Sequence, residues 1–263
     1  MKMKESVKKT IYYKDEVNDE FSGIARNRRT IDETYCYIHS GLGWRIVASF
    51  VYWVLALPIA FLYMKLKFGL KIENKEVLKP YQKEGYFLYG NHTQVPGDGF
   101  IQALVSYPKK NYVVVNADNV SLRGTEQLML MIGAMPLPTT IRGYRNFMEA
   151  LDQRCQAGIP IVIYPEAHIW PFYTRIRNFP QTSFQYPIRE GKPAFSFTTV
   201  YRKRKIRKIP KIVVKVDGPF WAEGNLPMKL AAKRLRDQVF DTMVVRAEES
   251  DCEYIKYVYS PET

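Results

Sequence analysis

A histidine and an aspartate follow the end of a predicted strand. Residues 86–90 form an apolar run typical of a strand, and His92 and Asp98 come next, in a segment rich in turn-forming residues. In an α/β unit, sites gather where strands end. We therefore expect the chemistry of this chain in the segment that contains His92 and Asp98.

Five residues separate His92 from Asp98, so the two side chains would lie roughly 20 Å apart on a straight strand and on different faces of a helix. Residues 95–98 read Val-Pro-Gly-Asp, which predicts a type II turn with a positive φ at Gly97. Such a turn would let Asp98 accept the Nδ1 proton of His92 and leave Nε2 as a base for a hydroxyl. A second interpretation stays open, in which Asp98 is only the N-cap of an apolar helix from Gly99 and His92 is an ordinary loop residue.

A second polar segment follows the clearest buried strand, predicted at residues 159–164. This strand leads into Pro165 and Glu166, which we expect at the same edge of the sheet as His92. Basic residues come soon after this strand and after a short predicted strand at 134–138. They are Arg142, Arg145, Arg175 and Arg177.

These segments resemble the sequence blocks of the glycerolipid acyltransferase family. Asn91-His92 with a nearby Asp98 is similar to the family's His-x4-Asp block, with one residue more between the two. Tyr164-Pro165-Glu166 is similar to the start of its Phe-Pro-Glu-Gly-Thr-Arg block, although Ala-His-Ile replaces Gly-Thr-Arg. Two weaker matches complete the family's order, at residues 133–139, where Thr139 replaces an arginine, and at residues 193–200.

The resemblance implies an enzyme, similar to a 1-acylglycerol-3-phosphate O-acyltransferase, that serves phospholipid synthesis. It would transfer a fatty acyl group from acyl-CoA or acyl carrier protein to a hydroxyl of lysophosphatidic acid or glycerol 3-phosphate. His92 and Asp98 would be catalytic, Glu166 would organise the acceptor pocket, and Arg142, Arg145, Arg175 and Arg177 are candidates for the phosphate. The thioester is a co-substrate, and no further cofactor is expected. The altered spacing and the missing Gly-Thr-Arg leave a non-catalytic lipid-binding relative as the alternative.

The charge of the chain points to an anionic partner. The sequence has 263 residues, a formal net charge of +13 and 46% hydrophobic residues. An anionic membrane surface or a phosphorylated substrate fits this charge. Nucleic acid is not expected, because the basic run at 202–211 lacks interleaved aromatic residues; that run is either a solvated surface or a site for anionic head groups or coenzyme phosphates. Three scattered histidines give no metal-ligand spacing, and three distant cysteines suggest reduced thiols.

Residues 46–64 form an uncharged stretch of nineteen residues, about 28 Å long as a helix and close to hydrocarbon thickness. Pro58 predicts a kink, and basic residues lie on both sides of the stretch. We expect a kinked or re-entrant anchor in one leaflet, on the cytoplasmic face of the cell membrane, either monotopic or single-pass. A spanning helix and a buried core helix are the alternatives.

The remaining pattern predicts one α/β domain with a mixed, largely parallel sheet flanked by helices, preceded by a membrane-associating helical segment. We place the polar extension and membrane helix in residues 1–71 and the α/β domain in 72–263, with no core element in 1–35. Strands are predicted at 86–90, 112–116, 134–138, 159–164, 193–200 and 212–216. Helices are predicted at 99–106, 122–132 and 144–158, and after an N-cap at Asn225.

Overall fold

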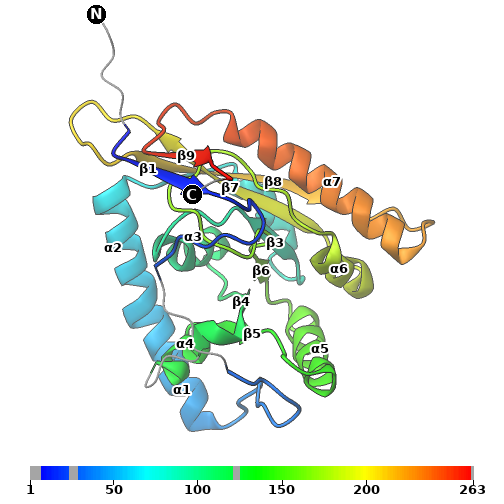
Figure 1. Cartoon of the computed structure of the whole chain (residues 1–263). Coiled ribbons are helices and arrows are strands. Elements are labelled where there is room, and N and C mark those ends of the chain that lie inside the picture. The colour runs from blue at the N-terminus through cyan, green and yellow to red at the C-terminus, as the bar shows by residue number, and fades with distance from the viewer. Residues whose placement is uncertain (1–6, 24–28, 121–124, 262–263) are drawn as a thin grey trace, which may run out of the picture.

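A seven-stranded sheet forms the centre of the molecule in the computed structural model, which describes residues 7–23, 29–120 and 125–261 (Figure 1). The strand order is β2-β8-β7-β3-β6-β4-β5, and every neighbouring pair is parallel except β7 with β8. The predicted α/β class with a mixed, largely parallel sheet is confirmed. The strands are β2 (Lys71–Glu73), β3 (Phe87–Gly90), β4 (Tyr112–Val115), β5 (Ala134–Pro136), β6 (Ile161–Ile163), β7 (Ala194–Arg202) and β8 (Lys211–Phe220).

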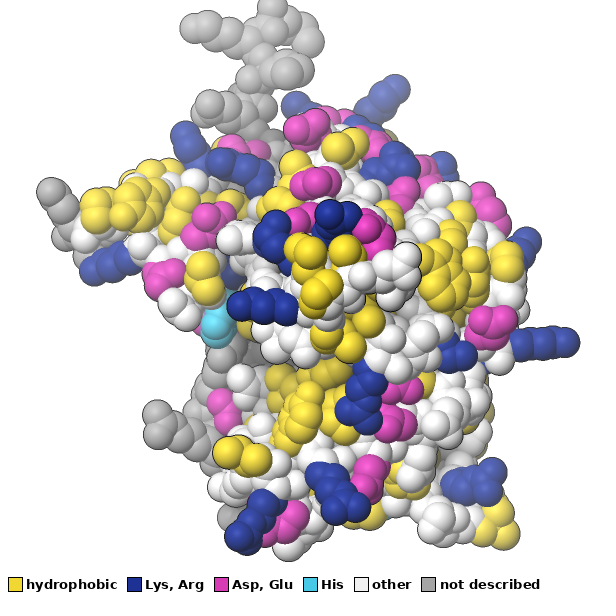
Figure 2. Space-filling model, turned by 90° about the vertical axis from the view of Figure 1, so that its right-hand side faces the viewer, with side chains coloured by type: hydrophobic (Ala, Val, Ile, Leu, Met, Phe, Trp, Pro, Cys, Tyr) yellow, Lys and Arg dark blue, Asp and Glu magenta, His cyan; other side chains and the backbone are white. Residues whose placement is uncertain are grey.

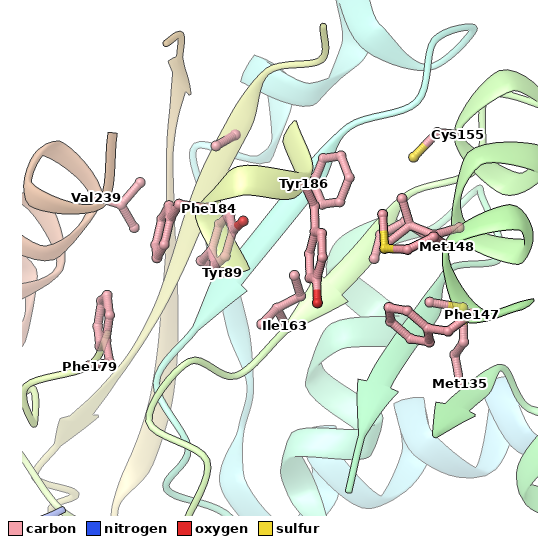
Figure 3. Packing of buried hydrophobic residues seen from close by; sticks show 14 of the residues in the cluster. Tyr89, Met135, Phe147, Met148, Cys155, Ile163, Phe179, Phe184, Tyr186 and Val239 are labelled. Carbon is pink, nitrogen blue, oxygen red and sulfur yellow. The ribbon is translucent and has the colours of Figure 1, made fainter. Parts of the chain in front are cut away.

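Helices cover both faces of the sheet because the central strands are apolar on both sides. Along β3, Phe87 and Tyr89 pack into one core and Leu88 packs into the other, since successive side chains of a strand point to opposite faces. Residues of α5, α6 and α7 complete the first core, in which the Tyr89 and Phe184 rings stack 4.1 Å apart (Figure 3). Residues of α2 and α3 complete the second. The helices are α2 (Leu57–Phe68), α3 (Gly97–Ser106), α4 (Glu126–Met131), α5 (Ile141–Gln156), α6 (Gln185–Glu190) and α7 (Met228–Ala247), with 3-10 turns at Lys75–Tyr81, Ala117–Val120 and Thr182–Phe184.

The topology brings two loops to one edge of the sheet. Strands β3 and β6 are parallel neighbours, with Phe87 opposite Ile161 and Tyr89 opposite Ile163. The loops that follow them therefore leave the sheet side by side, as expected from the sequence. Gly90 ends β3 because a side chain at this position would collide with the ring of Phe197 on β7. We call residues 91–96 the histidine loop and residues 164–181 the glutamate loop.

The apolar stretch forms one continuous helix from Leu42 to Phe68, in which α1 (Leu42–Phe50) joins α2 through a π-helical turn at Val51–Ala56. Just before Pro58, which lacks an N–H, the Leu57 N–H bonds Tyr52 O, five residues back; the kink predicted at this proline stays a prediction. By length and composition this helix is able to cross a membrane. Large apolar side chains are exposed along it, namely Leu42, Ile46, Val47, Phe50, Val54, Leu55, Ile59, Phe61, Leu62 and Leu66.

The surface on the side of α5 and α6 has a different character. Figure 2 shows basic and acidic side chains interspersed there, with apolar side chains scattered between them. Such a mixed surface is ordinary for a protein in contact with water. The long apolar helix, which lies on the other side of the molecule in Figure 1, differs from this mixed surface in the many large apolar side chains that it exposes.

The two ends of the described chain meet in a second, two-stranded sheet. Strand β1 (Lys9–Tyr13) pairs in parallel with β9 (Ile255–Tyr259). Ile11 and Tyr13 of β1 pack against an aromatic cluster formed by Trp170 and Tyr173 of the glutamate loop and Tyr257 of β9. The prediction that residues 1–35 hold no core element is therefore wrong, and Ile31 in the same stretch is fully buried.

Three local predictions need correction. The type II turn is wrong, because Gly97 begins α3 and the reversal is closed by the Asp98 N–H bonding Gln94 O at 3.0 Å. Asn225 does not cap the last helix, which begins at Met228 with Pro227 as its N-cap. The helix predicted from 122 is described from Glu126, and its first residues lie outside the described part of the chain.

Candidate active site

The histidine loop is fixed to the sheet by buried amides. The Asn91 side chain accepts the Thr199 N–H at 2.7 Å and donates to Thr199 O at 3.2 Å, which ties the loop to β7. Two residues further on, the Tyr201 hydroxyl bonds the Thr93 side chain at 2.8 Å and accepts from the Gln94 amide at 2.8 Å. A buried polar network that is satisfied in this way rigidifies the segment that carries it.

His92 and Asp98 are hydrogen-bonded. The distance from His92 Nδ1 to Asp98 Oδ2 is 2.8 Å, and the same carboxylate oxygen accepts the Gln94 N–H at 2.9 Å. With Asp98 ionised, Nδ1 carries the proton and Nε2 keeps its lone pair. Nε2 has no hydrogen-bond partner among the described residues, so the ring is held from one side and open on the other.

Tyr164, the first residue of the glutamate loop, supports this pair from behind. Its ring stacks on the His92 imidazole with centroids 4.4 Å apart, and its hydroxyl donates to Asp98 O at 2.7 Å. One side chain, directly after β6, therefore contacts both members of the pair. Burial raises the pKa of the Tyr164 hydroxyl well above its ordinary value, so it remains a donor.

The glutamate loop holds a fully buried ion pair. Glu166 Oε2 lies 3.0 Å from the Arg177 guanidinium, and the side chains are 0% and 1% exposed. Glu166 also accepts the backbone N–H groups of Arg177 at 3.1 Å and His92 at 3.2 Å. The carboxylate therefore joins the two loops at the backbone of the histidine.

Burial acts in the same direction on both carboxyl groups of the site. It raises the pKa of Asp98, and the hydrogen bond from His92 opposes this shift. It also raises the pKa of Glu166, and the charge of Arg177 opposes this shift. In each case burial opposes the charged form of the carboxyl group, and a specific partner favours it.

His92 and Asp98 border a cavity of about 710 Å³. Its walls are mostly apolar and run along β4 to α4 and to the apolar helix. The volume lies in the range of small-molecule sites, and an apolar wall with few polar groups is typical of them. The apolar lining residues include Ala56, Leu57, Ala60, Val113, Val115, Met129, Ile132, Leu137 and Ile163.

The structure places the predicted arginines in different surroundings. Arg142 and Arg145 lie on α5 with side chains 85% exposed, where they pair with Glu33 and Glu149. Arg175 is exposed on the glutamate loop, and Arg177 is the buried partner of Glu166. None of these four arginines is among the described residues that line the cavity, and Glu166 is not among them either.

Sequence reasoning missed several residues that shape the site. Tyr164 was assigned to its strand and matched to the first residue of a family block, but it was given no role in the site, where its ring stacks on His92. His168 borders the cavity, and its Nδ1 lies 3.2 Å from Glu20 Oε2 of the N-terminal segment. Ala167 has a φ of 62°, so the backbone at this position has the left-handed conformation that glycine adopts freely.

No protein-family model matches the sequence, and no curated protein matches it. Among solved structures, the crystal structure of the 1-acyl-sn-glycerophosphate (LPA) acyltransferase PlsC from Thermotoga maritima is similar to this chain, with a TM-score of 0.47. The sequences are 15% identical, and the match covers 68% of this chain and 72% of that chain. A similarity of this size does not assign a reaction to the chain.

Proposed function

We propose that this protein is a membrane-associated acyltransferase that moves a fatty acyl group from a thioester to a hydroxyl of a phosphorylated glycerolipid precursor. One observation carries the proposal: the hydrogen-bonded pair of His92 and Asp98, with Nδ1 and Oδ2 2.8 Å apart, borders an apolar cavity of about 710 Å³. A general base can activate a hydroxyl for attack on a thioester carbonyl, and an apolar cavity beside it can hold the long acyl chain.

His92 is the general base in this account. Nε2 takes the proton of the acceptor hydroxyl as its oxygen attacks the thioester carbonyl. The tetrahedral intermediate then loses the thiolate, and the imidazolium returns the proton to that sulfur. The products are an ester and a free thiol, and no acyl group is attached to the enzyme. Such base catalysis contributes about 10²–10⁴-fold to the rate.

Asp98 and Tyr164 position the base. The Asp98 carboxylate holds the proton on Nδ1 and stabilises the imidazolium that forms after proton transfer. Tyr164 limits rotation of the ring by stacking on it. Glu166 and Arg177 act one layer further back, because Glu166 contacts the His92 backbone rather than the cavity and Arg177 pairs with Glu166.

The apolar cavity takes the acyl chain in this proposal. Ala56, Leu57 and Ala60 of the long apolar helix form part of its wall, and that helix also presents exposed apolar side chains. A lipid substrate could therefore pass between membrane and cavity along one element. The proposed donor is a thioester of either coenzyme A or acyl carrier protein. The proposed acceptor is lysophosphatidic acid or glycerol 3-phosphate.

An acyl-transfer assay tests the proposal. The full chain is incubated with radiolabelled palmitoyl-CoA and, separately, with lysophosphatidic acid, glycerol 3-phosphate, lysophosphatidylcholine and monoacylglycerol. We expect a labelled ester with at least one phosphorylated acceptor and none with monoacylglycerol. If labelled ester formed with monoacylglycerol alone, the proposal of a phosphorylated acceptor would be contradicted. The same assay is repeated with palmitoyl-acyl carrier protein, and the absence of ester with every acceptor and both donors would contradict the proposed acyltransferase activity.

A further inference from the structure

A second cavity, of about 360 Å³, lies between the start of the apolar helix and the outer strands of the sheet. Its walls come from the segment before α1, from α1, from the start of β4 and from the end of α5, all in the lower part of Figure 1. Ala134 contributes to both cavities, whereas His92 and Asp98 border only the larger one. The second cavity is therefore separate from the candidate active site.

Two cations in its wall lack an anionic partner. Arg154 is only 8% exposed, and its guanidinium donates to the backbone carbonyls of Tyr37 at 2.7 Å and Ala150 at 3.1 Å. Lys110 Nζ donates to Met131 O at 2.6 Å. Neither side chain forms an ion pair with any carboxylate in residues 7–23, 29–120 or 125–261.

The absence of an anion is unfavourable at this location. Burial lowers the pKa of Lys110 to about 8, and the charge of Arg154 acts in the same direction. Arg45 adds a third cation to the wall, and the lining residues that the structure describes include no Asp or Glu. Backbone carbonyls and the Tyr112 ring, which lies under both cations, offset part of the cost of burying them. Buried charges in proteins are usually paired, so an anion in this cavity would reduce the desolvation penalty that is left.

The neighbouring surface indicates what the anion is attached to. Arg45, Ser49 and Trp53 lie at i, i+4 and i+8 on α1 and its extension and line the cavity. These three residues also line an open groove beside the exposed apolar side chains of the same helix. The apolar side chains in that groove are Leu42, Ile46, Phe50 and Val54. A cationic pocket thus adjoins an apolar surface. The two are complementary to the anionic phosphate and the hydrocarbon chains of a phospholipid.

We propose that this cavity binds the phosphate group of a membrane phospholipid, with Arg154 and Lys110 as inner ligands and Arg45 at the rim. A guanidinium matches phosphate by its planar pair of donors, and lysine adds a point charge. The rings of Trp44 and Trp53 line the site, and tryptophan favours the head-group level of a membrane. The acyl chains of the lipid lie along the exposed face of the helix. This lipid is a bound ligand and does not react.

Calorimetric titration of the full chain in detergent tests the proposal with three probes: dihexanoylphosphatidylglycerol, dihexanoylglycerol and inorganic phosphate. We expect binding of the phospholipid only. Lys110→Met should weaken it about tenfold or more, because a charge-assisted contact is lost. Lys229→Met, which removes the same charge from an exposed position on α7, should leave it unchanged.

Two further variants keep the test decisive. Arg45→Gln alters only the rim and should also weaken binding, so it replaces Lys110→Met if that variant melts at a lower temperature. His92→Ala should leave binding unchanged, which separates this cavity from the active site. If inorganic phosphate bound as tightly as dihexanoylphosphatidylglycerol, the claim that the bound anion belongs to a lipid would be overturned. Unchanged phospholipid binding in folded Lys110→Met and Arg45→Gln proteins would overturn the site itself.

Discussion

The histidine loop and the glutamate loop leave neighbouring parallel strands at one edge of the sheet, and a hydrogen-bonded pair of side chains lies at each. His92 of the first loop pairs with Asp98 in the first turn of α3, and Glu166 pairs with Arg177 within the second loop. His92 and Asp98 are 16% and 3% exposed and border the larger cavity, whereas Glu166 and Arg177 are 0% and 1% exposed and are not among the described residues that line it. One pair has a free nitrogen to exchange a proton with a substrate. In the other pair, Glu166 accepts hydrogen bonds from the backbone N–H groups of His92 and Arg177, one in each loop. We therefore propose that the first pair takes part in the reaction and that the second pair holds the two loops in position.

Removing the base is expected to have the largest effect. His92→Ala should lower kcat/KM for acyl transfer by about 10⁴-fold, since the hydroxyl loses its proton acceptor. The matched control is His168→Ala, which removes the other histidine of the same cavity and should cost less than about tenfold. Equal losses in the two variants would mean that the cavity needs both imidazoles and that the pair with Asp98 is not special.

Breaking the buried ion pair should act on stability. Arg177→Met leaves Glu166 as an uncompensated buried charge, so the free energy of unfolding should fall by about 3–5 kcal/mol. Arg175→Met, two residues earlier and exposed, should change it by less than about 0.5 kcal/mol. Urea denaturation measures both. If Arg177→Met unfolds like the wild type, the glutamate loop is not held by this pair.

Neutralising the carboxylate of the catalytic pair should cost less activity than removing the base. Asp98→Asn keeps the size of the side chain but no longer enforces the proton on Nδ1, so kcat should fall by about 10²-fold while the base remains present. Selective ¹⁵N labelling of histidine would show the change of tautomer at His92 directly. An unaltered tautomer together with a normal kcat would refute the positioning role of Asp98.

The smallest effect concerns backbone strain in the glutamate loop. Ala167 has a φ of 62°, which disfavours every residue with a Cβ, so Ala167→Gly should stabilise the protein by about 1 kcal/mol. Ala157→Gly, at a φ of −75°, should instead destabilise it slightly. Thermal melting compares the two. A destabilised Ala167→Gly protein would mean that Ala167 contributes contacts that outweigh the strain.

The pairing of His92 with Asp98 followed from the sequence even though the predicted turn was wrong. The expectation needed only that the chain reverse between the two residues, and the reversal here uses an Asp98 N–H to Gln94 O bond at the start of α3. Six of the seven strands of the sheet were predicted from short apolar runs, such as the one ending at Tyr164. Strand β2 was missed because its three residues, Lys-Ile-Glu, hold one apolar side chain and show no recognisable run.

Other features depend on partners far away in the sequence. Strand β1 pairs with β9, more than two hundred residues later, and neither strand is apolar enough to be recognised alone. The role of Arg177 depends on the burial of Glu166, and the unpaired state of Arg154 depends on which residues surround it. Burial and pairing of this kind arise only when the chain is folded.

In the proposed reaction the acyl group passes from the thioester directly to the acceptor hydroxyl, without an acyl-enzyme intermediate. Thiol release from palmitoyl-CoA and formation of labelled ester are measured together, with and without the preferred acceptor, and the protein is checked for bound label. The account predicts that one thiol is released per ester formed, that release without acceptor is negligible, and that no label stays on the protein. Rapid thiol release without acceptor, with label retained on the protein, would contradict it.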